Sequence, residues 1–145
     1  MTLLRMDNVL IVVDELEAAK AFFLDLGMEL EGEATVEGSS VDRLVALDGV
    51  RSTIAMMRTP DGHGRIELDK FHTPATSAKP GHAEVNALGI RRIMFAVDDI
   101  GAVLARMQAH GAELVGEVVQ YEDGYRLCYV RGPEGIMVAL AERLS

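Results

Sequence analysis

The chain has 145 residues, of which 49% are hydrophobic and 26% charged, and its formal net charge is −9 at pH 7. These values indicate one soluble globular domain, and the acidic charge argues against nucleic acid or an anionic membrane as a partner, because phosphate binding needs a basic surface. No apolar run approaches the about 20 residues that span a bilayer, and no basic segment with an apolar signal core opens the chain. The single cysteine, Cys128, excludes an internal disulfide framework and a zinc site built from cysteines, so we expect a cytoplasmic protein.

The N-terminal part of the chain predicts a strand, a helix and a second strand. Residues 8–13 form an apolar run rich in β-branched residues. Asp14 is well placed to cap a helix whose apolar stripe ends at Leu26. Gly27 stands where a helix commonly ends with a left-handed residue. We expect a strand over about 28–36 to follow.

A short helix, a hairpin and a linker are expected next. The sequence SSVDRLVALDG suggests a short helix, and strands at about 51–58 and 65–71 flank the turn TPDGHG. The segment at about 72–89 is rich in Pro, Ala, Ser and Gly and lacks periodicity, which is typical of a linker.

The second half of the chain repeats the first at a constant offset of 84 residues. Residues 13–33 and 97–117 share nine identities in 21 positions without a gap. The second copy predicts a helix that begins near Ile100, a GPEG turn, and strands at about 92–97, 112–120, 125–131 and 136–142. The chain therefore indicates one supersecondary unit, βαβββ, written twice.

Two βαβββ copies of this kind resemble the vicinal oxygen chelate superfamily, which includes glyoxalase I, extradiol dioxygenases and bleomycin-binding proteins. The resemblance rests on the helix starts VDEL and VDDI and on the Pro-acidic-Gly turns PDG and PEG, and it covers nearly the whole chain. It implies an α+β fold of two tandem βαβββ modules that form a curled mixed β-sheet cup in a single domain, 1–145. Module 1 would span about 1–71 and module 2 about 90–145. Members commonly form homodimers, side by side or with exchanged modules, and we expect a homodimer here.

In metal-using members of that superfamily, four ligands line the cup, with two from each module. One is a His or Gln at the start of the first strand, and the other is a Glu or His on the last strand. The positions that match these ligands here are Asn8, Glu67, Arg92 and Ala139. An arginine offers no lone pair and an alanine has no donor atom, so Glu67 is the one competent anionic ligand. We expect a degenerate metal site and no metal cofactor, with a divalent Zn, Fe, Mn or Ni ion as the alternative.

The alternation of side chains along a strand predicts the direction in which Arg92 points. Arg92 and Met94 share the face toward the cup, whereas Arg91 is expected in solvent at the helix-side edge. Arg92 then either pairs with Glu67 in a structural salt bridge or binds a ligand carboxylate or phosphate in bidentate fashion. Glu67 is the candidate catalytic residue, as a general base, although an arginine partner would lower its pKa. Asp69 is expected near the rim and solvated.

The first functional prediction is a small-molecule-binding protein. Its ligand would be an organic molecule in the β-sheet cup, and an anionic molecule is one option. The candidate ligand-binding residues are Asn8, Arg92, Met94, Tyr129 and Met137. The resemblance also supports a second prediction, a divalent-metal-dependent lyase, isomerase or dioxygenase that uses Glu67. A third is a protein that only supports a partner through its sheet surface.

Overall fold

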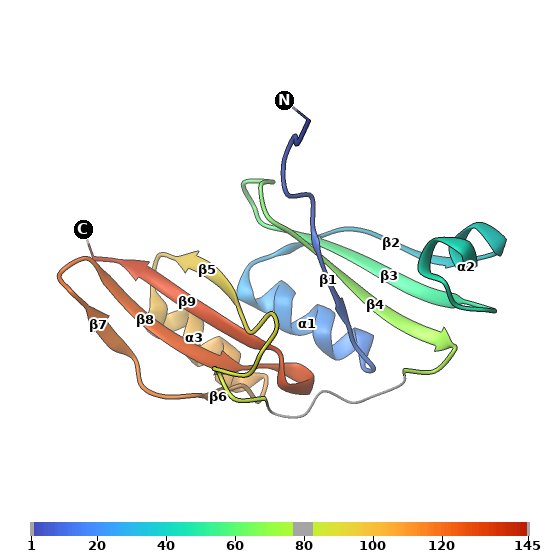
Figure 1. Cartoon of the computed structure of the whole chain (residues 1–145). Coiled ribbons are helices and arrows are strands. Elements are labelled where there is room, and N and C mark those ends of the chain that lie inside the picture. Colours follow the sequence, from blue (N-terminus) through green and yellow to red (C-terminus); the bar gives the residue numbers. More distant parts are fainter. Residues whose placement is uncertain (1, 77–82, 145) are drawn as a thin grey trace. The chain divides into compact units, whose positions relative to one another are not determined.

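The computed structural model describes residues 2–76 and 83–144, and the chain divides into two compact units, Met1–Lys79 and Pro80–Ser145 (Figure 1). Each unit contains one mixed β-sheet and a helix that packs on it, which confirms the α+β class and the repeated βαβββ pattern. Part of the predicted linker, residues 77–82, lies outside the described residues. In the described part of the chain, no helix combines the length and the apolarity needed to cross a membrane.

The first unit contains four strands in the spatial order β1-β4-β3-β2. Strand β1 pairs with β4 in parallel, and the other neighbours are antiparallel. The elements are β1 (Val9–Val12), α1 (Leu16–Leu26), β2 (Glu29–Glu37), α2 (Ser39–Val45), β3 (Arg51–Arg58) and β4 (Arg65–Thr73). Strand β1 therefore lies at an edge of its sheet.

The core of the first unit lies between α1 and one face of the sheet. Ala55 of β3 and Leu68 of β4 are register partners, and both are fully buried, as is Met57. Helix α1 contributes Phe22 and Phe23, whose rings meet edge to face with centroids 5.1 Å apart. Because side chains alternate along a strand, the residues between these core positions point to the opposite face. We call this opposite face, turned away from α1, the distal face.

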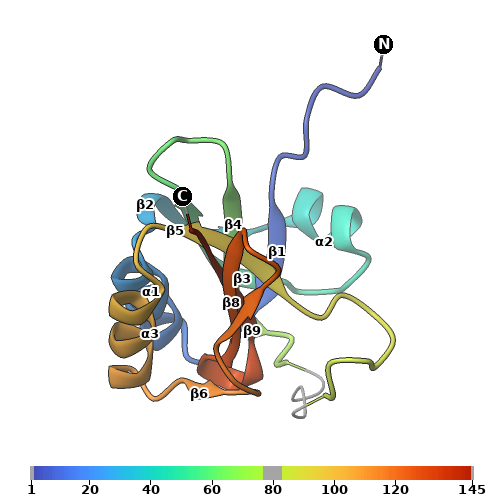
Figure 2. The ribbon, with the colours of Figure 1, turned by 90° about the vertical axis from the view of Figure 1, so that its left-hand side faces the viewer.

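The second unit repeats this arrangement in the order β5-β9-β8-β6, with β7 paired to β8. Its elements are β5 (Ile93–Val97), α3 (Ile100–Ala109), β6 (Glu113–Leu114), β7 (Val119–Tyr121), β8 (Tyr125–Arg131) and β9 (Met137–Arg143). Helix α3 lies along one side of these strands (Figure 2) and buries Val103 and Met107. The face turned away from α3 is the distal face of this sheet.

One predicted strand is wrong in the second unit. The expected strand over 112–120 is divided into β6 and β7, because the chain bends at Val115 and Gly116. The amide of Val115 still donates to the carbonyl of Tyr129, at 2.9 Å. Both short strands therefore remain beside β8, with the bend at Val115 and Gly116 between them.

Candidate functional site

The registers of the two sheets place Glu67 and Ala139 at equivalent positions. Glu67 of β4 is the parallel partner of Leu10 in β1. Ala139 of β9 is the parallel partner of Met94 in β5, 84 residues beyond Leu10. The strand pairing therefore relates Glu67 to Leu10 as it relates Ala139 to Met94.

The four residues at the ligand positions do not fit a divalent metal ion. Asn8 and Arg92 stand one residue before β1 and β5, and the amide of Asn8 donates to the carboxylate of Asp7 at 3.4 Å. Arg92 and the fully buried Ala139 offer no ligand atom, which leaves Glu67 as the one anionic donor. Within residues 2–76 and 83–144, no group of three or more His, Cys, Asp or Glu side chains could hold a metal ion.

Arg92 is held in place by an aromatic residue of its own sheet. Its Nε donates to the hydroxyl of Tyr129 at 2.8 Å, and its Cζ lies 5.6 Å from the centre of the Tyr129 ring. Arg92 remains partly exposed, and among the described residues of the second unit it has no carboxylate partner. The Tyr129 hydroxyl therefore orients one edge of the Arg92 guanidinium, while no carboxylate among the described residues of the second unit balances its positive charge. The predicted pairing of Arg92 with Glu67, a residue of the other unit, stays a prediction.

The residues around Arg92 make the distal face of the second sheet apolar and basic. Tyr129 pairs with Ala139, and Met94 is 40% exposed on the same face. Met137 has the same orientation but is buried, and it pairs with Arg131. Arg131 donates through Nη2 to the carbonyl of Ala83. The sequence prediction missed Arg131, although its two-residue spacing from Tyr129 could have placed both on one face.

Arg91 differs from the prediction. It was expected in solvent, but its Nε is buried without a hydrogen-bond partner in the described part of the chain. The two adjacent arginines therefore have different surroundings, and the one whose Nε is bound to a hydroxyl is Arg92.

Asp69 also differs from the prediction. It was expected to be solvated, but it is only 5% exposed. Burial raises the pKa of Asp69 to about 8, and a hydrogen bond to the Glu67 carboxylate and the negative charge of that group add to the shift. Asp69 and Glu67 are two residues apart on β4 and so both point to the distal face. The sequence spacing does place a carboxyl pair here, but the burial of Asp69 depends on packing.

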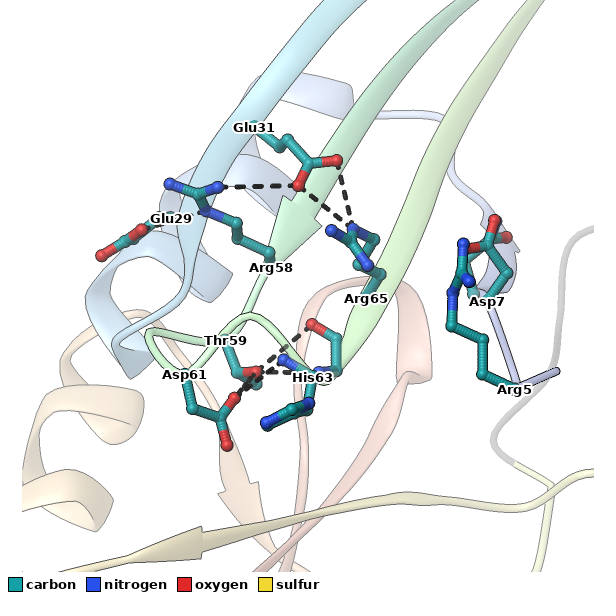
Figure 3. Close-up of polar contacts among 11 residues, drawn as sticks. Arg5, Asp7, Glu29, Glu31, Arg58, Thr59, Asp61, His63 and Arg65 are labelled. Atoms are coloured by element: carbon teal, nitrogen blue, oxygen red, sulfur yellow. Dashed lines mark hydrogen bonds and ion pairs between the residues drawn. The ribbon is translucent and has the colours of Figure 1, made fainter.

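A second polar cluster lies at the hairpin between β3 and β4 (Figure 3). Arg65 donates through Nε to both carboxylate oxygens of Glu31, at 3.1 and 3.2 Å, and Arg58 forms ion pairs with Glu29 and Glu31. Exposed pairs of this kind contribute roughly 0–1 kcal/mol each, so they support the hairpin only modestly.

The turn of this hairpin is organised by Asp61. Its carboxylate accepts from the Thr59 hydroxyl and from the His63 amide, and these hydrogen bonds lower the pKa of Asp61 (Figure 3). His63 itself lies on this turn. The second histidine of this unit, His72, points away from Glu67 and contacts the Thr53 hydroxyl through Nε2 at 2.7 Å. The contact with Thr53 holds the His72 ring away from the carboxyl pair.

Cys128 should be chemically inert in the folded protein. It is 2% exposed, and burial raises the pKa of its thiol, so little thiolate is present at neutral pH. We expect iodoacetamide to modify Cys128 much more slowly in the native protein than in urea, as measured by mass spectrometry. Modification at equal rates in the two states would show that the strand bearing Cys128 opens readily.

Comparison with known proteins gives one consistent family. The family model described as Glyoxalase/Bleomycin resistance protein/Dioxygenase superfamily matches residues 5–140. A glyoxalase family protein from Bacillus cereus, solved by crystallography, is 56% identical, with a TM-score of 0.97 over 100% of this chain and 97% of that one. The uncharacterized protein YaeR of Escherichia coli (strain K12) is 25% identical over 140 residues, which cover 96% of each chain.

One structural neighbour is described as a binding protein. TnmS3, an antibiotic binding protein from Streptomyces sp. CB03234, is 18% identical and has a TM-score of 0.61 over 99% of this chain and 98% of that one. At this identity the likeness concerns the fold alone.

Proposed function

Since the chain belongs to the glyoxalase/bleomycin resistance protein/dioxygenase superfamily, we propose that it binds a small organic molecule with an anionic group, and that Arg92 receives this group. The observation that carries the proposal is the Arg92–Tyr129 contact on the distal face of the second sheet. A guanidinium whose Nε is already bound to a hydroxyl still has the N–H groups of both terminal nitrogens available for a carboxylate or phosphate. Its side chain is oriented before the ligand arrives, which lowers the entropy cost of binding.

Two features of the surroundings support an organic ligand rather than a free inorganic anion. Met94 supplies a flexible and partly exposed apolar surface beside Arg92. The ring of Tyr129 supplies a flat surface with a polar tip. TnmS3, an antibiotic binding protein, has a similar fold, which agrees with a binding role for this chain.

The proposal includes no metal cofactor. Its support is chemical: Arg92 and Ala139 stand at positions where metal-using members need donor atoms. The rival is a metal-dependent lyase, isomerase or dioxygenase that uses Glu67. Metal analysis of protein purified without chelator separates the two functions, because one transition-metal ion per chain would contradict the proposal.

The binding proposal is tested with Arg92→Ala and a matched control, Arg126→Ala. Arg126 is on the same sheet but faces the opposite way, toward Glu142, at 3.9 Å. Benzoate and phenylphosphonate serve as anionic probes, and benzamide serves as the neutral counterpart of benzoate, with binding measured by NMR titration. We expect Arg92→Ala to weaken binding of the anions about tenfold or more, because a hydrogen bond to a charged group contributes about 1.5–3 kcal/mol.

The control variant should bind the anions as the native protein does, and benzamide should bind equally weakly to all three proteins. Equal affinity for benzoate and benzamide, or equal loss in both variants, would contradict a role for Arg92 in anion recognition. A lower melting temperature of Arg92→Ala with unchanged affinity would assign the residue a structural role.

The proposal also includes a homodimer, as the superfamily resemblance implies, and a cytoplasmic location, as expected for a chain with a single cysteine. Light scattering of the purified protein should then give about twice the chain mass of 15.7 kDa. A mass equal to one chain over the whole concentration range would contradict this part.

A further inference from the structure

A second guanidinium lies near Arg92 on the distal face of the second sheet. Arg131 is two residues after Tyr129 on β8, so it points to the same face as the tyrosine that binds Arg92. The strand pairing agrees, because Met137 of β9 pairs with Arg131, and the β5–β9 register, continued by one residue, sets Arg92 opposite Met137. The two arginines therefore flank Met137, with Cα atoms about two strand spacings apart, or roughly 10 Å.

Each of the two arginines is oriented by a neutral acceptor. Arg92 donates through Nε to the Tyr129 hydroxyl, and Arg131 donates through Nη2 to the carbonyl of Ala83. Arg92 is exposed and Arg131 is partly exposed, and none of the nitrogens of Arg131 is buried without a partner, unlike Nε of Arg91. Both guanidinium groups thus keep N–H donors that a ligand can reach.

No carboxylate balances the two positive charges. Glu113 of β6 is the register partner of Arg131, yet the two side chains form no ion pair. In the described part of the chain, neither Arg92 nor Arg131 has a carboxylate partner, although the chain as a whole has a net charge of −9. Two like charges on one patch repel each other, and a bound anion removes this repulsion.

The placement of the two guanidinium groups indicates how many anionic groups a ligand would carry. One carboxylate satisfies one guanidinium in bidentate contact, so a ligand with a single carboxylate leaves the second arginine without a partner. The two arginines come from β5 and β8, with β9 between them, which favours two separate anionic groups over one. The partly exposed Met94 offers apolar contact to the part of the ligand that joins them.

We propose that the ligand is a small organic dianion with two separate acidic groups, of which Arg92 receives one and Arg131 the other. This inference rests on the proposed function, because it shares Arg92 with it, and it adds Arg131 as the residue that distinguishes dianions from monoanions. The hydrogen bond to Ala83 then serves to hold the Arg131 side chain in position before the ligand binds.

The test compares glutarate with glutaramate, its monoamide, in NMR titrations of the full-length protein at pH 7. The two probes have nearly the same shape, and at this pH glutarate has two charged carboxylates while glutaramate has one. The flexible chain of both probes adapts to the separation of the two guanidinium groups. We expect glutarate to bind native protein about tenfold more tightly than glutaramate, because its second carboxylate gains a charged hydrogen-bonded partner.

Two variants of Arg131 assign the preference to this residue. In Arg131→Ala and in Arg131→Gln, glutarate should bind within about threefold of glutaramate, while the affinity for glutaramate changes by no more than about twofold. Arg131→Gln keeps an amide donor for the Ala83 carbonyl, so it remains informative if Arg131→Ala alters folding. The matched control is Arg143→Ala, which removes the same charge from the same face at the far end of β9, where Arg143 pairs with Tyr125.

A preference for glutarate that disappears in both Arg131 variants and persists in Arg143→Ala supports the inference. Equal affinity of native protein for the two probes, or a preference that persists without Arg131, would overturn it. A preference that disappears equally in Arg143→Ala would also overturn it, because overall charge would then be the cause. Failure of the proposed function has a different signature, since the affinity for glutaramate would then be unchanged in Arg92→Ala.

Discussion

The Asp69→Asn variant is expected to keep its stability as the pH rises from about 4 to about 8, whereas the native protein loses stability over this range. In the folded state the pKa of Asp69 is about 8, against 3.8 for a solvated aspartate. Between these values the unfolded chain is ionised and the folded chain holds the proton, so each rise in pH favours unfolding. The slope for one such group is at most about 1.4 kcal/mol per pH unit.

An asparagine at position 69 cannot ionise and has nearly the shape of the protonated acid. The variant should therefore be more stable than the native protein above pH 8, although it is expected to be no more stable at pH 4. Urea unfolding at pH 4, 6, 8 and 9 measures both curves. Because the pair with Glu67 titrates as a unit, the comparison is made on whole curves rather than on one midpoint.

The control for this prediction is Asp61→Asn. Asp61 is exposed on the hairpin turn, and its pKa is lowered by the hydrogen bonds from Thr59 and His63. A group with a lowered folded pKa loses its contribution as the pH falls, so Asp61→Asn should leave the decline above pH 4 unchanged. A native curve that stays level up to pH 8, or parallel curves for native protein and Asp69→Asn, would contradict the raised pKa.

The fold could be predicted because the repeat and the alternation of side chains are local properties of the sequence. The identities between residues 13–33 and 97–117 indicated two copies of one unit, and the strand registers agree with that offset. Alternation also predicted the faces of Ile93 and Met94, since two adjacent residues of a strand point to opposite faces. The fold and the sheet face to which each strand side chain points thus follow from short stretches of sequence.

The predictions that failed depended on contacts between distant residues. Asp14 was expected at the N-cap of α1, but the N-cap residue is Glu15, and Asp14 pairs with Lys70, 56 residues away, at 3.1 Å. The burial of Asp69 likewise depends on neighbouring strands, and so could not be read from its spacing to Glu67.

The candidate site was predictable in its residues but not in its contacts. Arg92 and Tyr129 were each placed by local pattern, whereas their hydrogen bond joins residues 37 positions apart. It requires the register of β8 on β9 and of β9 on β5, which no single stretch specifies.

The Leu68→Ala variant should lose about 2–5 kcal/mol of unfolding free energy, the range for removing a buried leucine side chain. Leu68 is fully buried in the core face of β4, where its register partner Ala55 offers little volume to close the cavity. Leu44→Ala is the matched control, because the same atoms are removed from α2 at a position that is 83% exposed, and its loss should stay within about 0.5 kcal/mol. Urea unfolding of both variants measures the difference. Leu68 lies between Glu67 and Asp69 but on the opposite face, so the result also tests the assignment of Glu67 and Asp69 to the distal face. Similar small losses in the two variants would mean that Leu68 is not in the core, and that the carboxyl pair is not on the distal face.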